Sequence, residues 1–201
     1  MEQLFYIIIL LFSVVVHEVS HGVMADKLGD PTARLAGRLT LNPIRHIDPF
    51  GSIILPLIMV LLPGNFIFGW AKPVPVNPYQ LKNPERDAAL IAGAGPASNL
   101  LLAAIFALFI KMGEIVASSL IVQSLPLLAA IVWVNIILAV FNLVPIPPLD
   151  GSKILFAFLP RSADRFKFAL EQNGTIILLF FIFFGFGLIL PIASFLYNIL
   201  T

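Results

Sequence analysis

Residues 4–21 have the sequence LFYIIILLFSVVVHEVSH, an uncharged apolar run that passes directly into two histidines and a glutamate. His17 and His21 are four residues apart, so on an α-helix they project from the same face and can bind one metal ion. Glu18 lies next to His17 in the chain and can reach a water molecule on that metal. Ionisable side chains inside a membrane segment are costly, so their presence indicates a functional site. The stretch therefore predicts a zinc hydrolase inside the bilayer.

The composition is that of a membrane protein. Hydrophobic residues make up 59% of the 201 residues and charged residues only 11%, whereas about 45–50% of residues are apolar in soluble domains. The mean hydropathy is +0.99. We expect an all-α polytopic membrane protein with about five or six apolar segments, folded as a single domain over residues 1–201. The uncharged runs that exceed the roughly 20 residues of one membrane span are 49–71, 88–110, 115–149 and 174–201.

Charge and cysteine content exclude two kinds of site. The net charge of +1 argues against nucleic acid as a partner, which would call for a concentrated basic surface. The chain has no cysteine, so it has neither disulfides nor thiolate zinc ligands. The first apolar run lacks a preceding basic segment and continues into the histidine motif, so we expect it to be retained and not cleaved as a signal peptide.

The apolar runs predict a first helix over 4–28, ended by Gly29-Asp30-Pro31, and a hairpin-like connector over 31–48. Repeated prolines exclude a helix over 63–84, although this segment is too apolar for an ordinary solvated loop. We expect it to be a re-entrant extended loop, whose polar backbone groups are satisfied by protein or by a water-filled cavity. The further helices predicted lie near 50–62, 88–110, 127–142, 152–159 and 175–200.

The charges around the first helix predict its orientation. Lys27, Arg34, Arg38 and Arg45 lie at or beyond its C-terminal end, whereas the opposite end offers only Glu2. The positive-inside rule then places the N-terminus outside the cell membrane. The histidine motif is expected nearer the cytoplasmic face.

Two histidines alone hold zinc poorly, because a catalytic site usually has three protein ligands and an open position for water. Asp150 is the acid that stands out as a third ligand, since it follows Pro145, Pro147 and Pro148. These prolines cannot continue a helix and place Asp150 at the start of a new helical piece. A carboxylate there suits either a metal ligand or a helix cap. His46, the remaining histidine, is expected to pack in a loop near the interface and is otherwise the next candidate ligand.

Two motifs together resemble the paired signature of the site-2 protease family of intramembrane metalloproteases. They are His17-Glu18-Val19-Ser20-His21 and Asn142-x-x-Pro145-x-Pro147-x-Leu149-Asp150-Gly151. Residues 68–77 resemble the re-entrant loop of compact prokaryotic members, and Gly93-x-Gly95-Pro96-x-x-Asn99 resembles the start of their glycine–asparagine helix. The resemblance spans residues 17–151. Unlike larger members, this chain is expected to carry no PDZ or CBS domain.

The resemblance implies one zinc ion per chain, held by His17, His21 and Asp150. Zinc lowers the pKa of a bound water from about 15.7 to about 7, and Glu18 would accept that proton and deliver it to the leaving amine. Asn142 and Asn99 are candidate donors to the oxyanion or to the substrate backbone.

The implied activity is hydrolysis of peptide bonds within or near transmembrane segments of membrane proteins, either in regulated proteolysis or in clearance of remnant signal peptides. The extended segment 66–76 is expected to pair with an unwound substrate. The sequence leaves the substrate, the trigger and the oligomeric state open.

A transporter or channel is the alternative from another functional class, with residues 145–150 as an unwound ion site. The sequence has no inverted repeat that we can see, which counts against this alternative. A catalytically inactive relative is disfavoured because Glu18 is present. Asn99 and Asn142 also suit hydrogen bonding between neighbouring helices.

Overall fold

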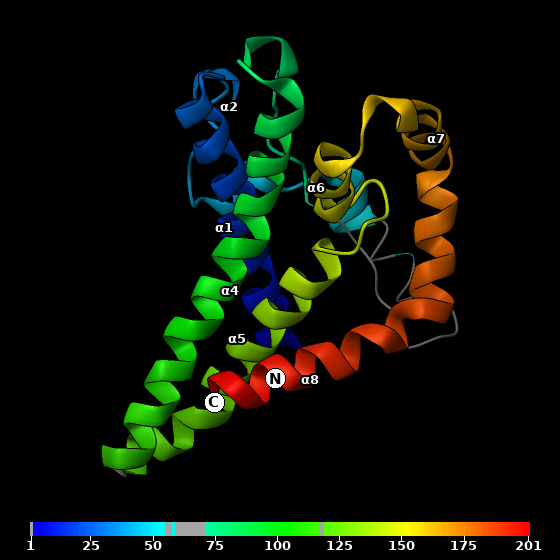
Figure 1. Cartoon of the computed structure of the whole chain (residues 1–201). Coiled ribbons are helices and arrows are strands. Elements are labelled where there is room, and N and C mark those ends of the chain that lie inside the picture. Colours follow the sequence, from blue (N-terminus) through cyan, green and yellow to red (C-terminus); the bar gives the residue numbers. More distant parts are fainter. Residues whose placement is uncertain (1, 55–57, 59–70, 117–118) are drawn as a thin grey trace.

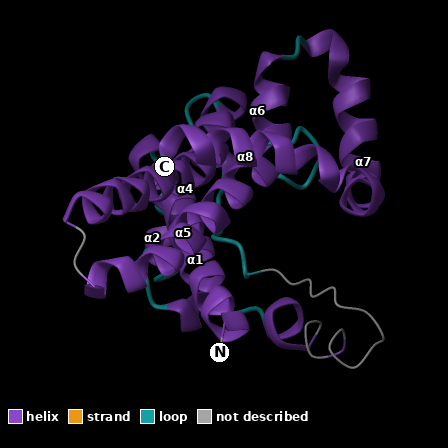
Figure 2. Cartoon of the chain, turned by 90° about the horizontal axis from the view of Figure 1, so that it is seen from below, coloured by secondary structure: helices purple, strands orange, loops and turns teal. Residues whose placement is uncertain are grey.

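The computed structural model describes residues 2–54, 58, 71–116 and 119–201. Figure 2 shows helices and loops throughout this part of the chain and no strand. The expected all-α fold is therefore confirmed.

The longer helices are α1 (Glu2–Leu28), α4 (Pro84–Val116), α5 (Ser119–Asn142), α6 (Asp150–Phe158), α7 (Asp164–Phe180) and α8 (Ile189–Leu200). The short ones are α2 (Thr32–Leu35), η1 (Pro43–His46), η2 (Pro49–Ile54), η3 (Pro78–Gln80), η4 (Arg161–Ala163), η5 (Phe181–Gly185) and η6 (Phe186–Leu188).

Four helices in the described residues are long and apolar enough to cross a membrane: Phe5–Leu28, Pro84–Gly113, Gln123–Asn142 and Asp164–Leu200. The helix predicted over 50–62 is described only as far as the single turn of η2 and residue 58. The re-entrant course predicted for residues 63–70 lies outside the described residues. The four membrane-length helices are therefore those of the described part of the chain.

Helix α4 is the centre of the bundle, with α1 and α5 packed along it and α6 beside it (Figure 1). Small side chains allow the close approach: Ala103 and Ala107 of α4 are buried, and so is Ala193 of α8. Small residues four apart are typical of helix contacts in membranes, where van der Waals packing replaces the hydrophobic effect. The larger members of this core are Ile110 of α4, Val132, Ile136 and Val140 of α5, and Ile189 of α8.

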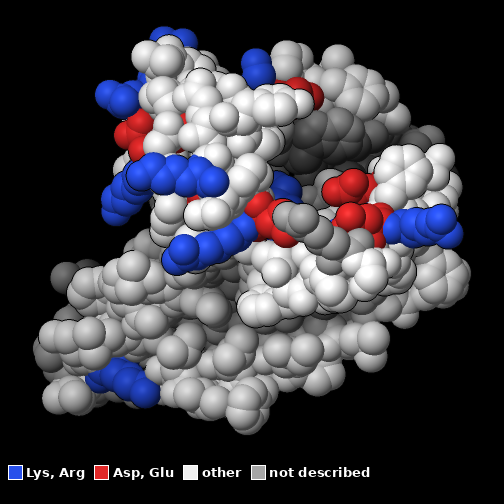
Figure 3. Space-filling view, turned by 45° about the horizontal axis from the view of Figure 1, so that its top comes forward, with Lys and Arg blue, Asp and Glu red and all other residues white. Residues whose placement is uncertain are grey.

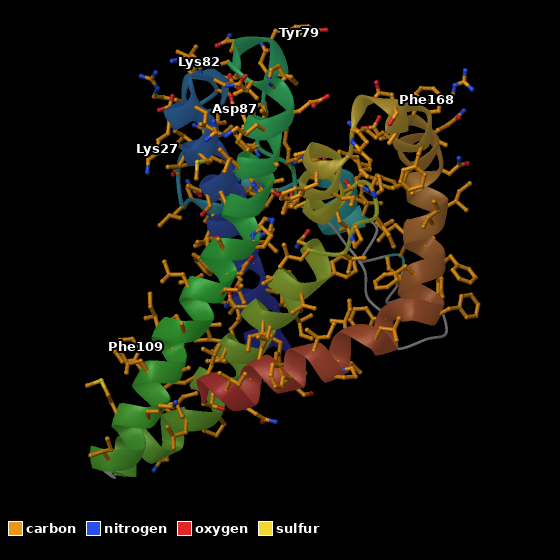
Figure 4. All side chains as sticks on the ribbon, in the orientation of Figure 1. Lys27, Tyr79, Lys82, Asp87, Phe109 and Phe168 are labelled. Carbon is orange, nitrogen blue, oxygen red and sulfur yellow. The ribbon has the colours of Figure 1, made fainter. Side chains whose placement is uncertain are left out.

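The outer surface is apolar over much of the bundle and charged at one end. Leu108 and Phe109 on α4 are 58% and 51% exposed, an arrangement that is stable against lipid and unfavourable against water. Lys27, Lys82 and Asp87 lie at the opposite end from Phe109 (Figure 4). Lysine, arginine and acidic side chains gather at that end on the face shown in Figure 3. We refer to it as the charged end.

The last membrane-crossing helix is bent, whereas the sequence predicted one span over 175–200. Helix α7 begins at Asp164, the π turn η5 and the 3-10 turn η6 redirect the chain, and α8 returns to pack on α5 (Figure 1). The buried Gly174 of α7 is the point of close approach to the loop before α6: a Cβ there would lie 2.7 Å from Pro147 Cβ.

The prediction of a hairpin-like connector over 31–48 is wrong. This stretch contains α2 and η1 and no strand. Side chains stabilise its turns in place of a ladder: Asp30 Oδ1 accepts from Thr32 N–H, and Asn42 Oδ1 accepts from Ile44 N–H at 3.1 Å. Asparagine and aspartate form such local bonds readily, and these compete with strand pairing.

Residues 71–77, in the described part of the segment predicted to be extended, form neither helix nor strand and are fastened to this connector by hydrogen bonds. Lys72 N–H donates to His46 O at 2.8 Å, and Arg38 Nη2 donates to Lys72 O at 2.7 Å. At the other end, Asn77 N–H donates to Asp30 Oδ2 at 2.6 Å. The segment is thereby held alongside α1 without a neighbouring strand.

Asp30 is fully buried just beyond the end of α1. Burial alone would raise its pKa, but hydrogen bonds from the Thr32 hydroxyl, from Asn77 N–H and from Thr32 N–H lower the pKa below its ordinary value. The folded state therefore favours the carboxylate. Asp30 joins the end of α1 to residues 71–77.

We expect Asp30→Asn to lower the stability of the protein by about 1–3 kcal/mol at neutral pH, because buried N–H donors lose a charged acceptor. The folded-state pKa lies below the unfolded value, so this contribution is complete above about pH 4 and is lost as the pH falls through the folded pKa. The measurement is the thermal unfolding midpoint in detergent between pH 3 and pH 7. Glu171→Gln, on an exposed site of α7, is the control. Equal midpoints for wild type and Asp30→Asn at pH 7 would contradict the prediction.

Candidate metal centre

His17 and His21 of α1 meet Asp150, the first residue of α6, inside the bundle. Asp150 Oδ2 lies 3.1 Å from His17 Nε2 and 3.1 Å from His21 Nε2. All three side chains are buried, and one ligand atom from each lies within 4.8 Å of the others. Tetrahedral zinc with bonds of about 2.0–2.1 Å separates its ligand atoms by roughly 3.3–3.4 Å. The three residues therefore fit a zinc ion in both chemistry and spacing.

Helix α4 orients both imidazole rings. His17 Nδ1 lies 2.6 Å from Asn99 Oδ1, and His21 Nδ1 lies 2.7 Å from Ile91 O. These oxygens can only accept, so each Nδ1 carries a hydrogen and each Nε2 faces Asp150, where a neutral ring can offer its Nε2 lone pair to a metal ion. This is the tautomer that binds a metal through Nε2.

A close approach of α4 to α1 makes these contacts possible. A Cβ at Gly95 would lie 2.6 Å from His17 Nε2, closer than real Cβ atoms come to other heavy atoms. The glycine motif noted in the sequence thus has a steric cause: α4 must pass directly over the imidazole rings. Any larger residue at position 95 would displace the rings or the helix.

Asn99 belongs to a buried polar network that joins three helices. Its Nδ2 donates to Asn135 Oδ1 at 2.9 Å and to Ser13 O at 3.3 Å. Asn135 Nδ2 in turn donates to Ser13 Oγ and to Ile131 O, each at 2.9 Å. Both asparagines are fully buried. Both amide hydrogens of Asn99 thus go to protein oxygens, and in this arrangement its carbonyl orients His17.

Asn135 and Ser13 were not among the residues selected from the sequence. Asn135 did carry a signal: it is the polar interruption of the apolar run 127–141 and lies seven residues, about two turns, before Asn142. An asparagine in a membrane helix is expected to find a hydrogen-bonding partner. Ser13 carried no comparable signal, since serines bond commonly to their own helix.

A cavity of about 180 Å³ opens beside the three candidate ligands. Glu18 lines it from α1, Asn142 from the end of α5 and Lys153 from the second turn of α6. Asn142 Nδ2 donates to Leu138 O at 2.9 Å, and the asparagine is half-buried at the cavity wall. Lys153 was also not selected from the sequence. The remaining lining residues are His17, His21, Pro73, Val74, Val76, Ile91, Pro148, Leu149 and Asp150.

Glu18 is positioned by the extended segment. Val74 N–H donates to Glu18 Oε2 at 2.8 Å. Pro73 and Pro75 have no N–H, Lys72 N–H is bonded to His46 O, and the carbonyls of Lys72 and Pro73 accept from Arg38. Residues 72–75 therefore have no free N–H for the substrate pairing expected of segment 66–76, of which residues 66–70 lie outside the described part.

His46 lies away from the metal centre. It is buried in η1, with Nε2 2.9 Å from Thr40 O, and its carbonyl accepts from Lys72 N–H. It lines neither the cavity nor the group of three candidate ligands. Its place in the structure is in the connector that fastens residues 71–77.

Comparison with known proteins points to one family. The chain matches the model of peptidase family M50 over residues 5–122 and 109–186. It is 38% identical over 187 residues to "Putative zinc metalloprotease YwhC" of Bacillus subtilis (strain 168), covering 87% of this chain and 78% of that protein. It is 29% identical over 167 residues to "Putative zinc metalloprotease Rip2" of Mycolicibacterium smegmatis, covering 83% of this chain and 62% of that protein. No solved structure matches the chain.

Removal of the Asn99 carbonyl is expected to weaken metal binding without removing a ligand. We expect Asn99→Ala to bind zinc about 10- to 100-fold more weakly, because His17 loses the acceptor that fixes its tautomer. The measurement is the zinc dissociation constant from competition with a chelator. Asn173→Ala, on the exposed face of α7, is the matched control and should bind as wild type does. Unchanged affinity in Asn99→Ala would show that α4 does not orient the ring.

Proposed function

The chain belongs to peptidase family M50, and from this premise we propose that its buried centre hydrolyses peptide bonds within or near transmembrane segments of other membrane proteins. An intramembrane zinc metalloprotease needs a metal centre, a general base and a membrane setting. The observation that carries the proposal is the meeting of His17, His21 and Asp150 beside Glu18, inside a bundle of membrane-length helices. Neither the family nor the relatives support the transporter considered from the sequence.

We assign one zinc ion to His17, His21 and Asp150. Two neutral imidazoles and one carboxylate are a common ligand set for catalytic zinc, which keeps one position open. Bound there, zinc supplies a more acidic water and polarises the scissile carbonyl. The spacing of the three ligand atoms and the fixed ring tautomers support the assignment.

Glu18 is the proposed general base. One of its oxygens is held by Val74 N–H, which leaves the other free to take a proton from the attacking water. The same carboxyl group then returns the proton to the leaving amine. A base held in one orientation loses less freedom on reaching the transition state than a mobile one.

Asn142 is the proposed donor to the substrate, either at the developing oxyanion or at the peptide backbone. Its side chain lines the cavity, and one of its amide hydrogens is used by Leu138 O. The second hydrogen is available for a substrate oxygen. Asn99, also considered for this role from the sequence, acts in our proposal through His17.

The bonding of a helical backbone supports cleavage of an unwound substrate. The carbonyls within a helical segment already accept hydrogen bonds from N–H groups of the next turn. A helical segment therefore has to become extended before one of its carbonyls is free to be attacked. The walls formed by Val74, Val76 and Leu149 are apolar, which suits residues drawn from a membrane span.

We propose that the charged end of the molecule faces the cytoplasm of a cell whose cytoplasmic membrane the protein spans. Lys27 lies in the last turn of α1, and Arg34, Arg38 and Arg45 follow the helix in the chain. The positive-inside rule places such a cluster in the cytoplasm. His17 and His21 are nearer this end of α1 than the other, which supports a metal centre in the cytoplasmic half of the bilayer.

The zinc content of variants distinguishes the proposed metal ligands from the proposed general base. We expect purified wild type and Glu18→Gln to contain nearly one zinc per chain, and His17→Ala and Asp150→Ala to contain much less, because only the latter two lose a ligand. Elemental analysis by mass spectrometry provides the measurement. Asn142→Ala should keep its zinc. Full zinc content in Asp150→Ala would remove Asp150 from the ligand set.

Proteolysis tests the base directly. We expect Glu18→Gln to cleave a co-reconstituted membrane-protein substrate about 10²- to 10⁴-fold more slowly than wild type, the range that general acid–base catalysis contributes. The cleaved fraction is followed over time on gels, with zinc content measured on the same samples. Cleavage by Glu18→Gln at the wild-type rate would exclude Glu18 as the base.

A further inference from the structure

We propose that a second pocket, at the charged end of the molecule, binds an anionic phosphate group, carried either by a membrane lipid or by free phosphate. The pocket has a volume of about 370 Å³. It is distinct from the cavity of the metal centre, with which it shares Pro73 as a wall. We call it the basic pocket, and its described lining residues are Ala36, Arg38, Arg45, Lys72, Pro73 and Pro75.

Three cations converge on the basic pocket from three separate parts of the chain. Arg38 follows α2, Arg45 belongs to η1, and Lys72 lies in the extended segment. No acidic residue lines the pocket within the described part of the chain. Cations held together in this way repel one another and create a positive potential that attracts anions. Repulsion among these cations therefore destabilises the fold, and a bound anion would reduce that repulsion.

The two outer cations are available to a ligand. The side chains of Arg45 and Lys72 are exposed. Neither forms an ion pair with any residue that the structure describes. Elsewhere at the charged end, Arg34 does have such a partner, in Asp26 at 2.9 Å. What distinguishes the pocket is that its unpaired cations lie together on one cavity, with no acidic side chain among the described lining residues.

The third cation is buried and incompletely bonded. Arg38 is 7% exposed. Its Nη2 donates to Lys72 O at 2.7 Å and to Pro73 O at 3.3 Å, whereas its Nε is buried without a partner. A guanidinium has five N–H donors, and a buried charge is costly unless it is paired. An anion in the pocket would supply the counter-charge that Arg38 lacks.

Phosphate is the anion that this set of donors suits. Arginine offers a planar fork that matches phosphate oxygens, and lysine adds a point charge. Leu35, Leu41 and Ile44 lie on the same connector and are 80%, 59% and 73% exposed. Apolar side chains beside uncompensated cations are typical of a surface at the boundary of an anionic bilayer. This neighbourhood favours a lipid headgroup over free phosphate.

The test measures ligand binding to the full-length protein in detergent, independently of proteolysis. The probes are dioctanoyl phosphatidylglycerol, dioctanoyl phosphatidylcholine and inorganic phosphate, each titrated by calorimetry. The test variant is Arg45→Gln/Lys72→Gln. Its matched control is Lys82→Gln/Arg86→Gln, which removes the same two residue types from exposed sites at the start of α4, near the charged end. Elution profiles and unfolding midpoints confirm that both pairs fold.

We expect phosphatidylglycerol to bind with a stoichiometry near one, and phosphatidylcholine to bind much more weakly. The test variant should weaken phosphatidylglycerol binding about 10- to 30-fold, because two cations that face the headgroup are lost. The control pair should stay within about 2-fold of wild type. If the test pair fails to fold, Arg45→Gln and Lys72→Gln singly should each weaken binding about 3- to 5-fold.

Three other outcomes are informative. Binding of inorganic phosphate with the same sensitivity to the test pair would support the pocket and identify free phosphate as its ligand. Equal weakening by the test and control pairs would overturn the proposal, since it would indicate general attraction to the charged end. Absence of binding by both phosphatidylglycerol and phosphate would also overturn it. None of these results bears on whether the metal centre is a protease.

Discussion

Polar groups buried in an apolar bundle must find partners within the protein, and this constraint organises the whole structure. The imidazole hydrogens of His17 and His21 cannot be left unbonded at membrane depth. Helix α4 supplies an acceptor for each ring hydrogen: Asn99 Oδ1 for His17 and the carbonyl of Ile91 for His21. That in turn requires α4 to pass within reach of the rings, which the absence of a side chain at Gly95 permits. The close approach of α4 to α1 is thus tied to the bonding of the two histidines.

The same requirement explains how an extended segment is held beside the centre without a sheet. Prolines at 73 and 75 remove two donors that a strand ladder would need. The remaining groups bond to scattered partners: His46 O, Arg38 and Asp30, each from the connector around the end of α1. Val74 N–H is the donor left for Glu18. The position of Glu18, the proposed base, is thus set by the connector as much as by α1.

The two pockets lie on either side of this extended segment. Val74 and Val76 line the cavity of the metal centre, Lys72 and Pro75 line the basic pocket, and Pro73 is common to both. A short segment of alternating valine and proline thereby separates the cavity that holds the candidate metal ligands from a positively charged pocket.

The sequence by itself determined the helical class, the apolar spans, the histidine pair and the candidate third ligand, because these depend on local spacing and hydropathy. His17 and His21 share a face on any helix, and three prolines within four residues before Asp150 cannot continue a helix. Only the tertiary structure decided what depends on distant packing. Asp150 meets His17 across 133 residues, and Asn135 meets Ser13 across 122. The connector over 31–48 formed turns where a hairpin was predicted, and the last span bent at η5 and η6. Long-range contacts satisfy the buried donors and acceptors, and no local pattern specifies which partners will meet.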